Sequence, residues 1–525
     1  MAISQLWKNY LWEDQGFTTL IFYEYPFFLS VPLLLLSLYL LFIRNKSSHG
    51  KLNLPPSPRR LPIIGNLHQL GKFPHRSLRA LSEKYGPLML LNLGQIPTLV
   101  VSSPDLVAEI VNTHDVIFSS RPKTTATEVL FYGNNDVAFA PYGEYWRQMR
   151  KICVVELLSL KRVQSFQFVR EEETEVLLDQ VRKACLYGET TINLSQMLSD
   201  ASNNIIARCI LGLSYKAEDG SLSKLGELSK RVMVELIAFS VGDFFPSLKW
   251  VDVVRGFLAR LGSTFRELDA FNNCLVQEHK TMKIAPNHDG SEKKDFVEVL
   301  LRLQEDRKLD FELTQDQLKA ILQDLFIAGI ETSSTAMEWL MAELLRHPRV
   351  MKKAQEEIRR VVGEKEKVDV NDINQMYYLK NVVKETMRLH PPGPLLVPRE
   401  ITARVQLGGY DIPAKTRVLI NAWAIQRHAD FWERPEEFIP ERFENNPMDL
   451  SGQDFKLIPL GFGRRRCPGL AFGISGIEYL IANILYWFDW KLPNDIAENM
   501  DMTEVYGISV SKKFPLHVVP IPYSP

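Results

Sequence analysis

The pattern of hydrophobic and polar positions divides the chain into an apolar N-terminal run and a long, mainly helical body. Residues 27–43, FFLSVPLLLLSLYLLFI, carry no charge, and their length is close to the ~17 to 25 residues that a helix needs to cross a bilayer. From Phe73 onward helical periodicity dominates, and strand-like runs are confined to short pieces at residues 88–93 and 97–102. The sequence therefore predicts a mainly α protein with small β-sheets, preceded by one transmembrane helix.

Charged residues on either side of the apolar run indicate its orientation. Arg44, Lys46 and Lys51 follow it, whereas Lys8 stands before it among acidic residues, so the positive-inside rule places the body on the cytosolic side. A buried core helix and a cleaved signal peptide are the alternatives, but no A-x-A-like cleavage site follows the leucines. We expect a lumenal segment over residues 1–26, an anchor over 27–43, a basic and proline-rich hinge over 44–62 and a globular domain over 63–525.

Composition and charge limit the kinds of partner that the protein can bind and the cellular compartment in which it can lie. The 525 residues are 46% hydrophobic and 24% charged, which is enough material for a large buried core. The formal net charge of -1 gives no global basic field, so nucleic acid is not expected as a partner. The five cysteines form no C-x-x-C pair, which suits a reducing compartment and argues against a disulfide framework or a zinc knuckle.

The longest predicted helix opens at Thr314, where Gln317 completes a capping box, and it ends before His347 and Pro348. In its middle, residues 328–335 read AGIETSST. Small residues there allow another group to come close to the helix backbone, and the Thr332 hydroxyl can donate a hydrogen bond to the carbonyl of Ala328. Such a stretch can bend or open a helix. A tight helix crossing is the alternative, and the fragment alone favours it.

Two later fragments carry charged residues that would compensate one another if they were buried together. KETMRLHPP places Glu385 and Arg388 three positions apart on one helix face. FIPERF, at residues 438–443, offers Arg442 as a second cation for Glu385, and a buried carboxylate needs such compensation. An unrelated exposed pair is the alternative for either fragment taken separately.

A third fragment, PLGFGRRRCPG at residues 459–469, crowds three glycines and three arginines around Cys467. Neighbouring arginines favour a thiolate over a thiol, and a thiolate is a metal ligand. Because no second cysteine or histidine stands at zinc spacing, the metal would have to bring its other ligands with it, as haem iron does. A structural cysteine beside a phosphate-binding arginine cluster is the alternative.

Taken in order, these motifs resemble those of the cytochromes P450, which are haem-thiolate monooxygenases. The order is a proline-rich hinge, AGIETS, E-x-x-R, P-E-R-F and the cysteine loop, and the resemblance covers the chain from about Pro55 to its end. DVAFAPYGEYWRQMRK, at residues 136–151, looks like the plant microsomal enzymes of specialised metabolism. The resemblance implies the cytochrome P450 fold, with haem b between the long helix and the cysteine loop, so that residues 63–525 would form a haem-thiolate catalytic domain.

The resemblance also implies a role for each matching residue. Cys467 would be the axial haem ligand, and Glu331 and Thr332 the oxygen-activating pair. Glu385, Arg388 and Arg442 would form a structural triad. Trp146, Arg150, Arg399 and Arg465 match positions that usually hold the haem propionates. Substrate contacts are expected from Phe326, Ala328, Leu395, Val397, Tyr506 and Ile508. One departure is Leu460, which stands where the family's loop begins with phenylalanine, so an aromatic neighbour of the haem is lost.

The source of electrons follows from what the sequence lacks. No G-x-G-x-x-G follows a strand and no P-loop occurs, so a separate reductase is expected. By resemblance it is the NADPH-cytochrome P450 reductase of the endoplasmic reticulum membrane. With O2, the enzyme would hydroxylate or otherwise oxidise a small apolar plant metabolite, with a terpenoid or an alkaloid expected as substrate. Two alternatives stay open: a haem-thiolate rearrangement or dehydration enzyme that activates no oxygen, and a non-catalytic membrane haem protein.

Overall fold

The computed structural model describes residues 52–188, 191–212, 221–284, 294–306, 311–493 and 500–524, together with Leu33, Leu36 and Ser37. It has two compact units, Met1–Leu54 and Pro55–Pro525. Leu33, Leu36 and Ser37 are helical, but the rest of the predicted lumenal segment, anchor and first part of the hinge lies outside the described residues. The domain limits expected from the sequence therefore stay predictions, and the second unit carries the elements that follow.

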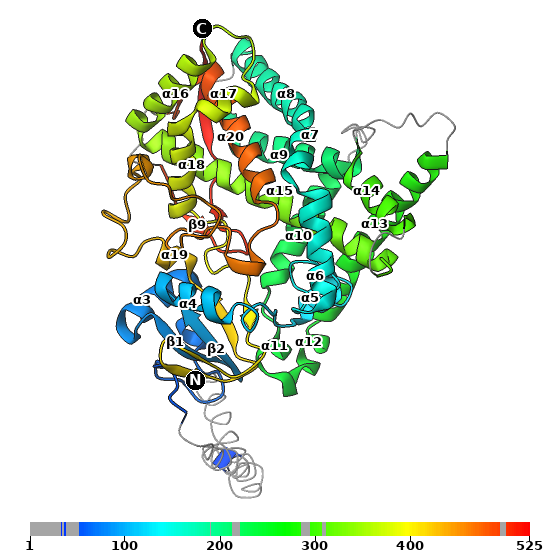
Figure 1. The fold of residues 1–525 in the computed structure, drawn as a ribbon, viewed down its shortest axis with the longest axis vertical. Helices are drawn as coiled ribbons and strands as arrows, with labels where there is room; N and C mark the ends of the chain where they lie inside the picture. The colour runs from blue at the N-terminus through cyan, green and yellow to red at the C-terminus, as the bar shows by residue number, and fades with distance from the viewer. Residues whose placement is uncertain are drawn as a thin grey trace, which may run out of the picture. The chain divides into compact units, whose positions relative to one another are not determined.

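Helices make up most of the second unit (Figure 1). The longer ones are α3 (Pro74–Tyr85), α4 (Pro104–His114), α6 (Glu144–Lys151), α8 (Gln167–Leu186), α9 (Leu194–Leu211), α10 (Ser221–Ile237), α13 (Phe257–Ile284), α14 (Phe296–Glu305), α15 (Gln315–Arg346), α16 (Pro348–Val362), α18 (Tyr377–Leu389) and α20 (Leu470–Trp487). The shorter ones are α5 (Thr125–Leu130), α7 (Leu160–Ser165), α11 (Val241–Phe244), α12 (Trp250–Val254), α17 (Val370–Gln375) and α19 (Ala422–Ile425). Single turns occur at η1 (Leu67–Gln69), η2 (Ile152–Leu157), η4 (Pro246–Leu248), η5 (Pro440–Phe443) and η6 (Gly463–Arg465).

The strands form small separate sheets. The four-stranded sheet has the order β1-β2-β7-β4, in which β2 and β7 are parallel and the other two pairs are antiparallel. In Figure 1 its first two strands lie beside α3 and α4. The strands are β1 (Leu88–Leu93), β2 (Ile96–Val101), β3 (Ile192–Asn193), β4 (Arg399–Glu400), β5 (Val405–Leu407), β6 (Tyr410–Ile412), β7 (Arg417–Ile420), β8 (Phe488–Lys491), β9 (Glu504–Val505), β10 (Ser511–Lys512) and β11 (His517–Pro522). The strand-like runs predicted at residues 88–93 and 97–102 correspond to β1 and β2.

Helix α15 confirms the ends predicted for the longest helix. The Gln317 N–H donates to Thr314 Oγ1 at 3.3 Å, and the Thr314 N–H donates to Gln317 Oε1 at 3.0 Å, so the capping box is complete. At its other end α15 stops at Arg346, because Pro348 has no N–H with which to continue the ladder and instead begins α16.

The small residues in the middle of α15 serve a tight helix crossing. The helix is continuous through residues 328–335, so this stretch is not opened. A methyl group added at Gly329 would lie 2.6 Å from Ile206 Cδ1 of α9, a separation that real side chains do not adopt. Gly329 therefore allows α9 and α15 to pack closely, as the alternative interpretation of this stretch expected.

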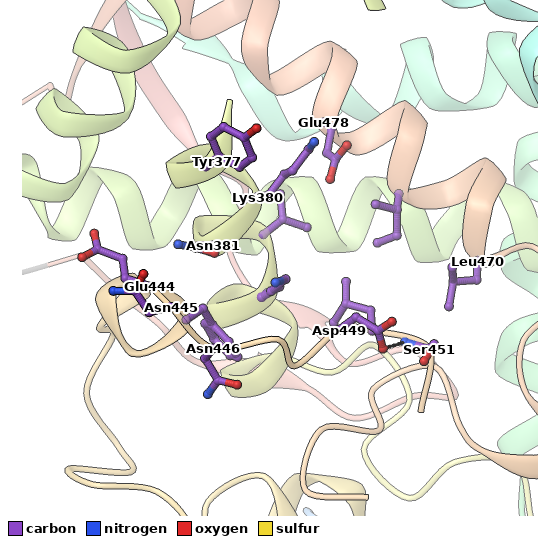
Figure 2. Close-up of a pocket in the computed structure, with 15 residues that line it drawn as sticks. Tyr377, Lys380, Asn381, Glu444, Asn445, Asn446, Asp449, Ser451, Leu470 and Glu478 are labelled. Atoms are coloured by element: carbon purple, nitrogen blue, oxygen red, sulfur yellow. Dashed lines mark hydrogen bonds between the residues drawn. The ribbon is translucent and has the colours of Figure 1, made fainter. Parts of the chain in front are cut away.

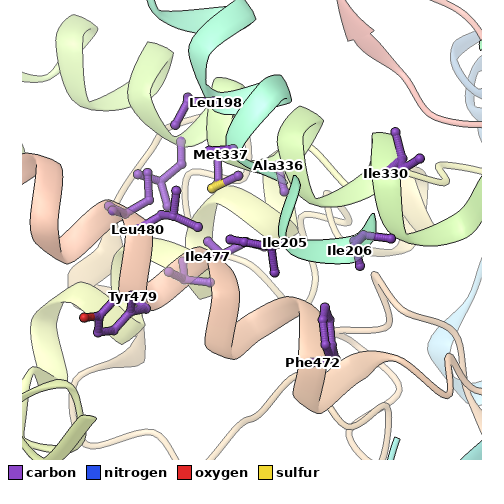
Figure 3. Close-up of a cluster of buried hydrophobic side chains, with 14 of the residues drawn as sticks. Leu198, Ile205, Ile206, Ile330, Ala336, Met337, Phe472, Ile477, Tyr479 and Leu480 are labelled. Carbon is purple, nitrogen blue, oxygen red and sulfur yellow. The ribbon is translucent and has the colours of Figure 1, made fainter. Parts of the chain in front are cut away.

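The main core lies where α9, α15 and α20 meet (Figure 3). On α9 the buried residues first recur every three or four positions, as on a helix with one apolar face, and from Ile205 to Leu211 all but Arg208 are buried. Each fully buried leucine or isoleucine contributes about 1.5–3 kcal/mol to stability. Side chains that Figure 3 shows in this cluster are Leu198, Ile205, Ile206, Ile330, Ala336, Met337, Ile477 and Leu480.

One helix among the described residues is long and apolar enough to cross a membrane, and it is α20. Its most apolar window is 56% buried inside the unit, and residues such as Leu480, Ile481 and Leu485 are buried in the main core. Its apolar character is therefore explained by its position in the core.

Candidate functional site

The cysteine loop, residues 459–469, is shaped by glycines and by backbone hydrogen bonds. Gly461 and Gly463 have φ of 77° and 61°, in the left-handed region that favours glycine. A side chain at Gly463 would also lie 2.6 Å from Asp115 Oδ1. The Cys467 N–H donates to the Leu460 carbonyl at 2.9 Å. Because α20 begins three residues later, the loop holds Cys467 beside the positive end of a helix.

The charges around the Cys467 thiol differ from those expected. Burial raises the pKa of Cys467, and the Gly469 N–H, Arg150 and Arg466 oppose that rise without cancelling it. Arg464 instead pairs with Asp115 at 2.9 Å. Arg150 and Arg466 therefore favour the thiolate as expected, but in the protein alone burial outweighs them. A bound metal cation deprotonates a coordinating thiol by its own charge.

Four guanidinium groups, which we call the arginine cluster, gather near the cysteine loop: Arg121, Arg150, Arg399 and Arg465. Burial lowers the pKa of each, to about 10 for Arg399 and to about 9 for Arg465. The charge of Arg399 adds to the lowering at Arg121 and at Arg465, which shows that these groups lie close to one another. In the described part of the chain none of the four forms an ion pair with a carboxylate within 4.0 Å. The cluster is therefore a concentration of buried positive charge without a contacting carboxylate, and Asp136 and Asp115 compensate it only partly and from a distance.

The hydrogen bonds of the cluster go to backbone carbonyls. Arg465 donates from Nε to Ser119 O at 2.7 Å and from Nη1 to Val137 O at 3.1 Å. Arg121 donates to Ala138 O at 3.0 Å and to Pro398 O at 2.9 Å. Arg399 donates from Nη2 to Phe462 O at 2.9 Å, while its Nη1 is buried with no partner among the described residues. These carbonyls fix the arginines in place but leave their charges uncompensated.

This arrangement fits the haem that the resemblance implies. Haem carries two propionate carboxylates on one edge, and buried cations with a free N–H suit such an anionic edge. Among the described residues no group of three His, Cys, Asp or Glu side chains could hold a metal ion, so a metal bound at Cys467 has to bring its other ligands. Cys467 and the arginine cluster could therefore hold the iron and the propionates.

Two residues change the set predicted for the propionates. Trp146 Nε1 donates to Val137 O at 3.0 Å, and its ring lies 4.1 Å from the Arg465 guanidinium. The Trp146 N–H is therefore bonded to the chain and its ring supports Arg465, while its contact with a propionate stays a prediction. Arg121 belongs to the cluster but was not predicted. It precedes Pro122 in a polar turn, and nothing in that local sequence distinguishes it from an exposed arginine.

Glu331 and Thr332 lie on α15 as predicted, both half-buried. The Thr332 hydroxyl donates to Ala328 O at 2.7 Å, the hydrogen bond expected from the sequence. Burial raises the pKa of Glu331, and the charge of Lys230 only partly opposes this. A carboxyl group in such a setting can keep a proton and release it to a neighbouring acceptor.

The three residues predicted as a triad meet in the structure. Arg388 donates from Nε to Glu385 Oε2 at 2.7 Å and from Nη2 to Glu385 Oε1 at 2.9 Å, and both side chains are fully buried. Arg442 Nε and the Ile439 N–H add donors to Glu385 Oε1 at 3.0 and 2.8 Å. Arg388 also donates to Pro435 O at 2.7 Å. The alternative of an exposed pair is excluded by this burial.

The six predicted substrate contacts fall into two groups. Phe326 is 2% exposed and packs edge-to-face on Phe271 of α13, with ring centres 5.8 Å apart. Leu395 is 8% exposed and belongs to the core beside β1 and β2. Both side chains therefore pack among core residues, and their contact with a substrate stays a prediction.

The remaining four are accessible to different degrees. Ala328 is exposed although it lies mid-way along α15. Val397, Tyr506 and Ile508 are half-buried. Ile508 packs against an apolar cluster that includes Leu130, Phe131 and Ile327. That cluster joins α5, α10, α13 and α15, and its members other than Ile508 were not predicted.

A surface pocket of about 690 Å³ lies elsewhere, between α18, η5 and the first turns of α20 (Figure 2). Its lining includes Lys380, Lys384, Asp449 and Glu478. Burial raises the pKa of Glu478 to about 7. No predicted site residue lines this pocket, although the Ser451 carbonyl in its lining accepts a hydrogen bond from Arg466 of the cysteine loop at 2.9 Å.

Known proteins give three comparisons. The family model described as "Cytochrome P450" matches residues 55–517. A phenylacetaldehyde oxime monooxygenase from Prunus mume is 54% identical over 537 residues, covering 100% of both chains. A costunolide synthase from Cichorium intybus is 46% identical over 494 residues, covering 94% of this chain and 97% of that one. A solved zebra fish cytochrome P450 with progesterone has a TM-score of 0.74 at 27% identity, covering 86% of this chain and 99% of that one.

Proposed function

This chain belongs to the cytochrome P450 family and is a haem-containing monooxygenase of the plant type, and from that premise we propose its substrate, electron source and site residues. We infer that it uses O2 and electrons derived from NADPH to oxidise a small apolar specialised metabolite. The observation that supports the site most directly is the arginine cluster, whose buried charges lie near the cysteine loop and have no carboxylate in contact among the described residues.

The residues would divide the work of holding the cofactor. Cys467 would ligate the iron, and Arg121, Arg150, Arg399 and Arg465 would surround the propionates. Bound haem supplies the electron-transfer and dioxygen chemistry. Glu385, Arg388 and Arg442 would stabilise the segment that leads to the cysteine loop. Leu460 keeps its backbone role, because its carbonyl accepts the Cys467 N–H at 2.9 Å.

On the other side of the site, α15 would supply protons and exclude water. The Glu331 carboxyl, with its raised pKa, would hold a proton. The Thr332 hydroxyl, which donates to Ala328 O at 2.7 Å, would supply a hydrogen-bond donor on the dioxygen side of the site. The apolar cluster beside Ile508 would keep the substrate side dry.

Thr332→Ala should fold and consume NADPH but divert electrons to peroxide. Ser334→Ala is the matched control, because its hydroxyl also donates to a carbonyl one turn back along the helix. Unchanged coupling of NADPH to product in Thr332→Ala would remove Thr332 from this role.

The alternatives raised by the sequence have less support. A rearrangement or dehydration enzyme that activates no oxygen has no use for the Glu331 and Thr332 pair, which this chain retains. A non-catalytic haem protein does not fit a chain that is 54% identical over its full length to a relative named as a monooxygenase.

The substrate class is proposed from the apolar residues near the site and from the names of two relatives. Apolar lining suits a terpenoid or an alkaloid, and one relative is named costunolide synthase. The relative named phenylacetaldehyde oxime monooxygenase favours a second candidate, a small aromatic oxime. A ligand-induced spectral screen with a sesquiterpene, an alkaloid and phenylacetaldehyde oxime would decide between them. A spectral shift with the oxime alone would reject the terpenoid and alkaloid proposal.

Cys467→Ser tests the ligand assignment. The variant should take up some haem but lose the red-shifted band of the reduced carbon monoxide complex, because serine supplies no thiolate. Cys274→Ser is the matched control, since that cysteine is exposed. If Cys467→Ser kept the band, another cysteine would be the ligand and the proposed site would be rejected.

Location in the endoplasmic reticulum membrane, with the domain in the cytosol, is proposed from residues 27–43 and the basic residues after them. Anchoring enzyme and reductase to one surface raises their effective concentration. A chain starting at Lys51 should therefore keep its haem spectrum but lose turnover with reductase in dilute vesicles. A carboxy-terminal tag should be open to protease in intact microsomes, and a protected tag would reverse the orientation.

A further inference from the structure

Two carboxyl groups, Asp136 and Asp324, meet behind the arginine cluster. Asp324 lies on α15, two turns before Glu331, and its Oδ2 accepts the Val137 N–H at 2.6 Å and the Ala138 N–H at 3.3 Å. Asp136 is fully buried, and its Oδ2 accepts the Phe139 N–H at 2.8 Å. The two side chains are also within hydrogen-bonding reach of each other. We call Asp136 and Asp324 the carboxyl pair.

One oxygen of the carboxyl pair has no donor. Asp136 Oδ1 is buried and has no hydrogen-bond partner among the described residues. A buried acceptor without a donor costs roughly 1–3 kcal/mol. A proton on Asp324 would turn that group into an O–H donor and would supply the missing bond to Asp136. Two carboxylates in contact also repel each other strongly when both are ionised.

The carboxyl pair connects directly to the arginine cluster through one short segment, residues 136–140. The Val137 N–H donates to Asp324, while the Val137 carbonyl accepts from Trp146 and Arg465. The Ala138 carbonyl accepts from Arg121 at 3.0 Å. The same peptides that the carboxyl pair holds therefore hold the arginines.

We propose that Asp136 and Asp324 share one proton, so that the carboxyl pair carries a single negative charge, and that this charge positions the arginine cluster and sets the electric field at the haem. The two residues are positioning residues, since they act through residues 137–140 and touch neither substrate nor cofactor. The part that concerns haem rests on the proposed function; the shared proton does not.

Electrostatics support the geometry. Burial raises the pKa of Asp136 to about 6, against the Phe139 N–H and the charge of Arg465. Burial, followed by the charge of Asp136, raises the pKa of Asp324 well above its usual range. The other titratable and charged groups that face the pair are Arg121, Tyr145 and Cys153. Burial raises the pKa of the Cys153 thiol to about 12, and it also raises that of Tyr145, so both stay neutral near pH 7.

The first experiment detects the shared proton without using activity. Infrared difference spectra of the full-length holoprotein against Asp136→Asn and against Asp324→Asn should contain a protonated-carboxyl band near neutral pH that shifts on exchange into D2O. Taking the difference removes the bands of other carboxyls with a raised pKa, such as Glu331 and Glu478. Asp136→Asn and Asp324→Asn should each remove that band, because the remaining carboxyl then ionises and accepts a hydrogen bond from the new amide. A wild-type protein that lacks the band, or two variants that both keep it, would overturn the proposal.

The second experiment determines the net charge of the carboxyl pair. The haem midpoint potential is measured for the wild type, the two single asparagine variants and the double variant, which together form a double-mutant cycle. Each single asparagine variant keeps one negative charge, so its potential should match that of the wild type. The double variant has none, and its ratio of ferrous to ferric haem at a fixed potential should rise by about tenfold, the order expected for one charge ~10 Å away at an effective dielectric of ~20. Tenfold corresponds to about 59 mV for a one-electron couple.

Other results of the cycle reject the proposal in distinct ways. A similar rise at each single step would mean that both carboxyls are ionised. An unchanged potential in the double variant would mean that the pair carries no charge or does not act on the haem. As a check on the sign, the wild-type potential should rise as the pH falls through about 6, where the pair takes up a second proton, and the double variant should lack that step.

Failure of the proposed function looks different from failure of this inference. If the wild-type protein bound no haem, no potential could be measured and the haem proposal would fall. The infrared band would still decide whether the proton is shared. If haem binds through Cys467 and the band is absent, the proposed function stands and this inference alone is rejected.

Discussion

Two groups of buried arginines in this protein differ in how their charges are compensated. Around Glu385 every charge has a partner within the chain: Arg388 binds the carboxylate through two hydrogen bonds, and Arg442 adds a third at 3.0 Å. In the arginine cluster the donors reach only backbone carbonyls, and Arg399 Nη1 has no partner among the described residues. The first group can stabilise the folded chain alone, whereas the second is suited to an anionic ligand.

The comparison shows how a stabilising charge can be distinguished from a binding charge. Removing one partner of a compensated buried pair leaves the other charge unpaired, which is strongly destabilising. Removing a buried cation that no carboxylate contacts instead removes the free-energy cost of burying its charge. The two groups should therefore respond in opposite ways to the same kind of substitution.

The largest effect is expected at the compensated pair. Arg388→Ala should lower the free energy of unfolding by about 3–5 kcal/mol, because Glu385 would remain buried with only Arg442 as counter-ion. Little holoprotein should be recovered. Arg147→Ala is the matched control, since Arg147 also pairs with a glutamate three residues away but on the surface, where a pair contributes about 0–1 kcal/mol. Equal losses in the two variants would show that burial of Glu385 and Arg388 does not matter.

A smaller effect on stability, but a clear effect on haem, is expected in the arginine cluster. Arg399→Met should change the unfolding free energy of the haem-free protein by less than ~1 kcal/mol, or raise it, because an uncompensated charge is replaced by an apolar side chain. Haem should dissociate faster from the variant, measured by transfer to an excess of an apo-haem protein. Arg417→Met on the adjacent strand β7 is the control, and it should leave haem release unchanged. A strong loss of stability without a change in haem release would place Arg399 in the first group.

A third test sharpens the comparison through pH. Glu504 is a compensated carboxylate that accepts from Arg76 at 2.7 Å and contacts His75 at 3.0 Å. Although burial opposes it, hydrogen bonds to His75 and Arg76 lower the pKa of Glu504 to about 2, from a usual value of 4.5. A lowered pKa contributes stability that is present above pH 4.5 and is lost as the pH falls toward 2.

The check is to compare wild type with Glu504→Gln in urea unfolding over that pH range. The difference between the two should be largest near pH 6 and should shrink as the solution becomes more acidic. A difference that stays constant with pH would mean that Glu504 contributes no charge to stability.

Features set by neighbouring residues could be predicted from the sequence. The ends of α15 follow from Thr314, Gln317 and Pro348, which act within one turn. The contact of Glu385 with Arg388 follows from their spacing on one helix face. Thr332 and its bond to Ala328 belong to the same class. In each case the partners are close in sequence, so local geometry decides.

Features set by distant segments could not be predicted. Arg121 joins the cluster only because residues 119–140 fold against 397–466, and the meeting of Asp136 with Asp324 has the same origin. Phe326 was placed at the site because it lies near AGIETS, but helical position alone does not say that Phe271 covers it. The thiol of Cys467 was expected to ionise because arginines are next to it in sequence, whereas burial controls its pKa.

The separation along the chain of these contacts also bears on the order in which the protein folds. The longest hydrogen bond in sequence around Glu385 and Arg388 joins Glu385 to Arg442, which is 57 positions away. In the arginine cluster, Arg465 donates to Ser119, which is 346 positions away. Closing the longer loop costs about 1.6 kcal/mol more in chain entropy, so we expect the Glu385 region to form first and the arginine cluster last. Haem would then enter a chain whose cysteine-loop half is already structured. Pulse-labelling hydrogen exchange during refolding would show this as earlier protection in α18 than in α6.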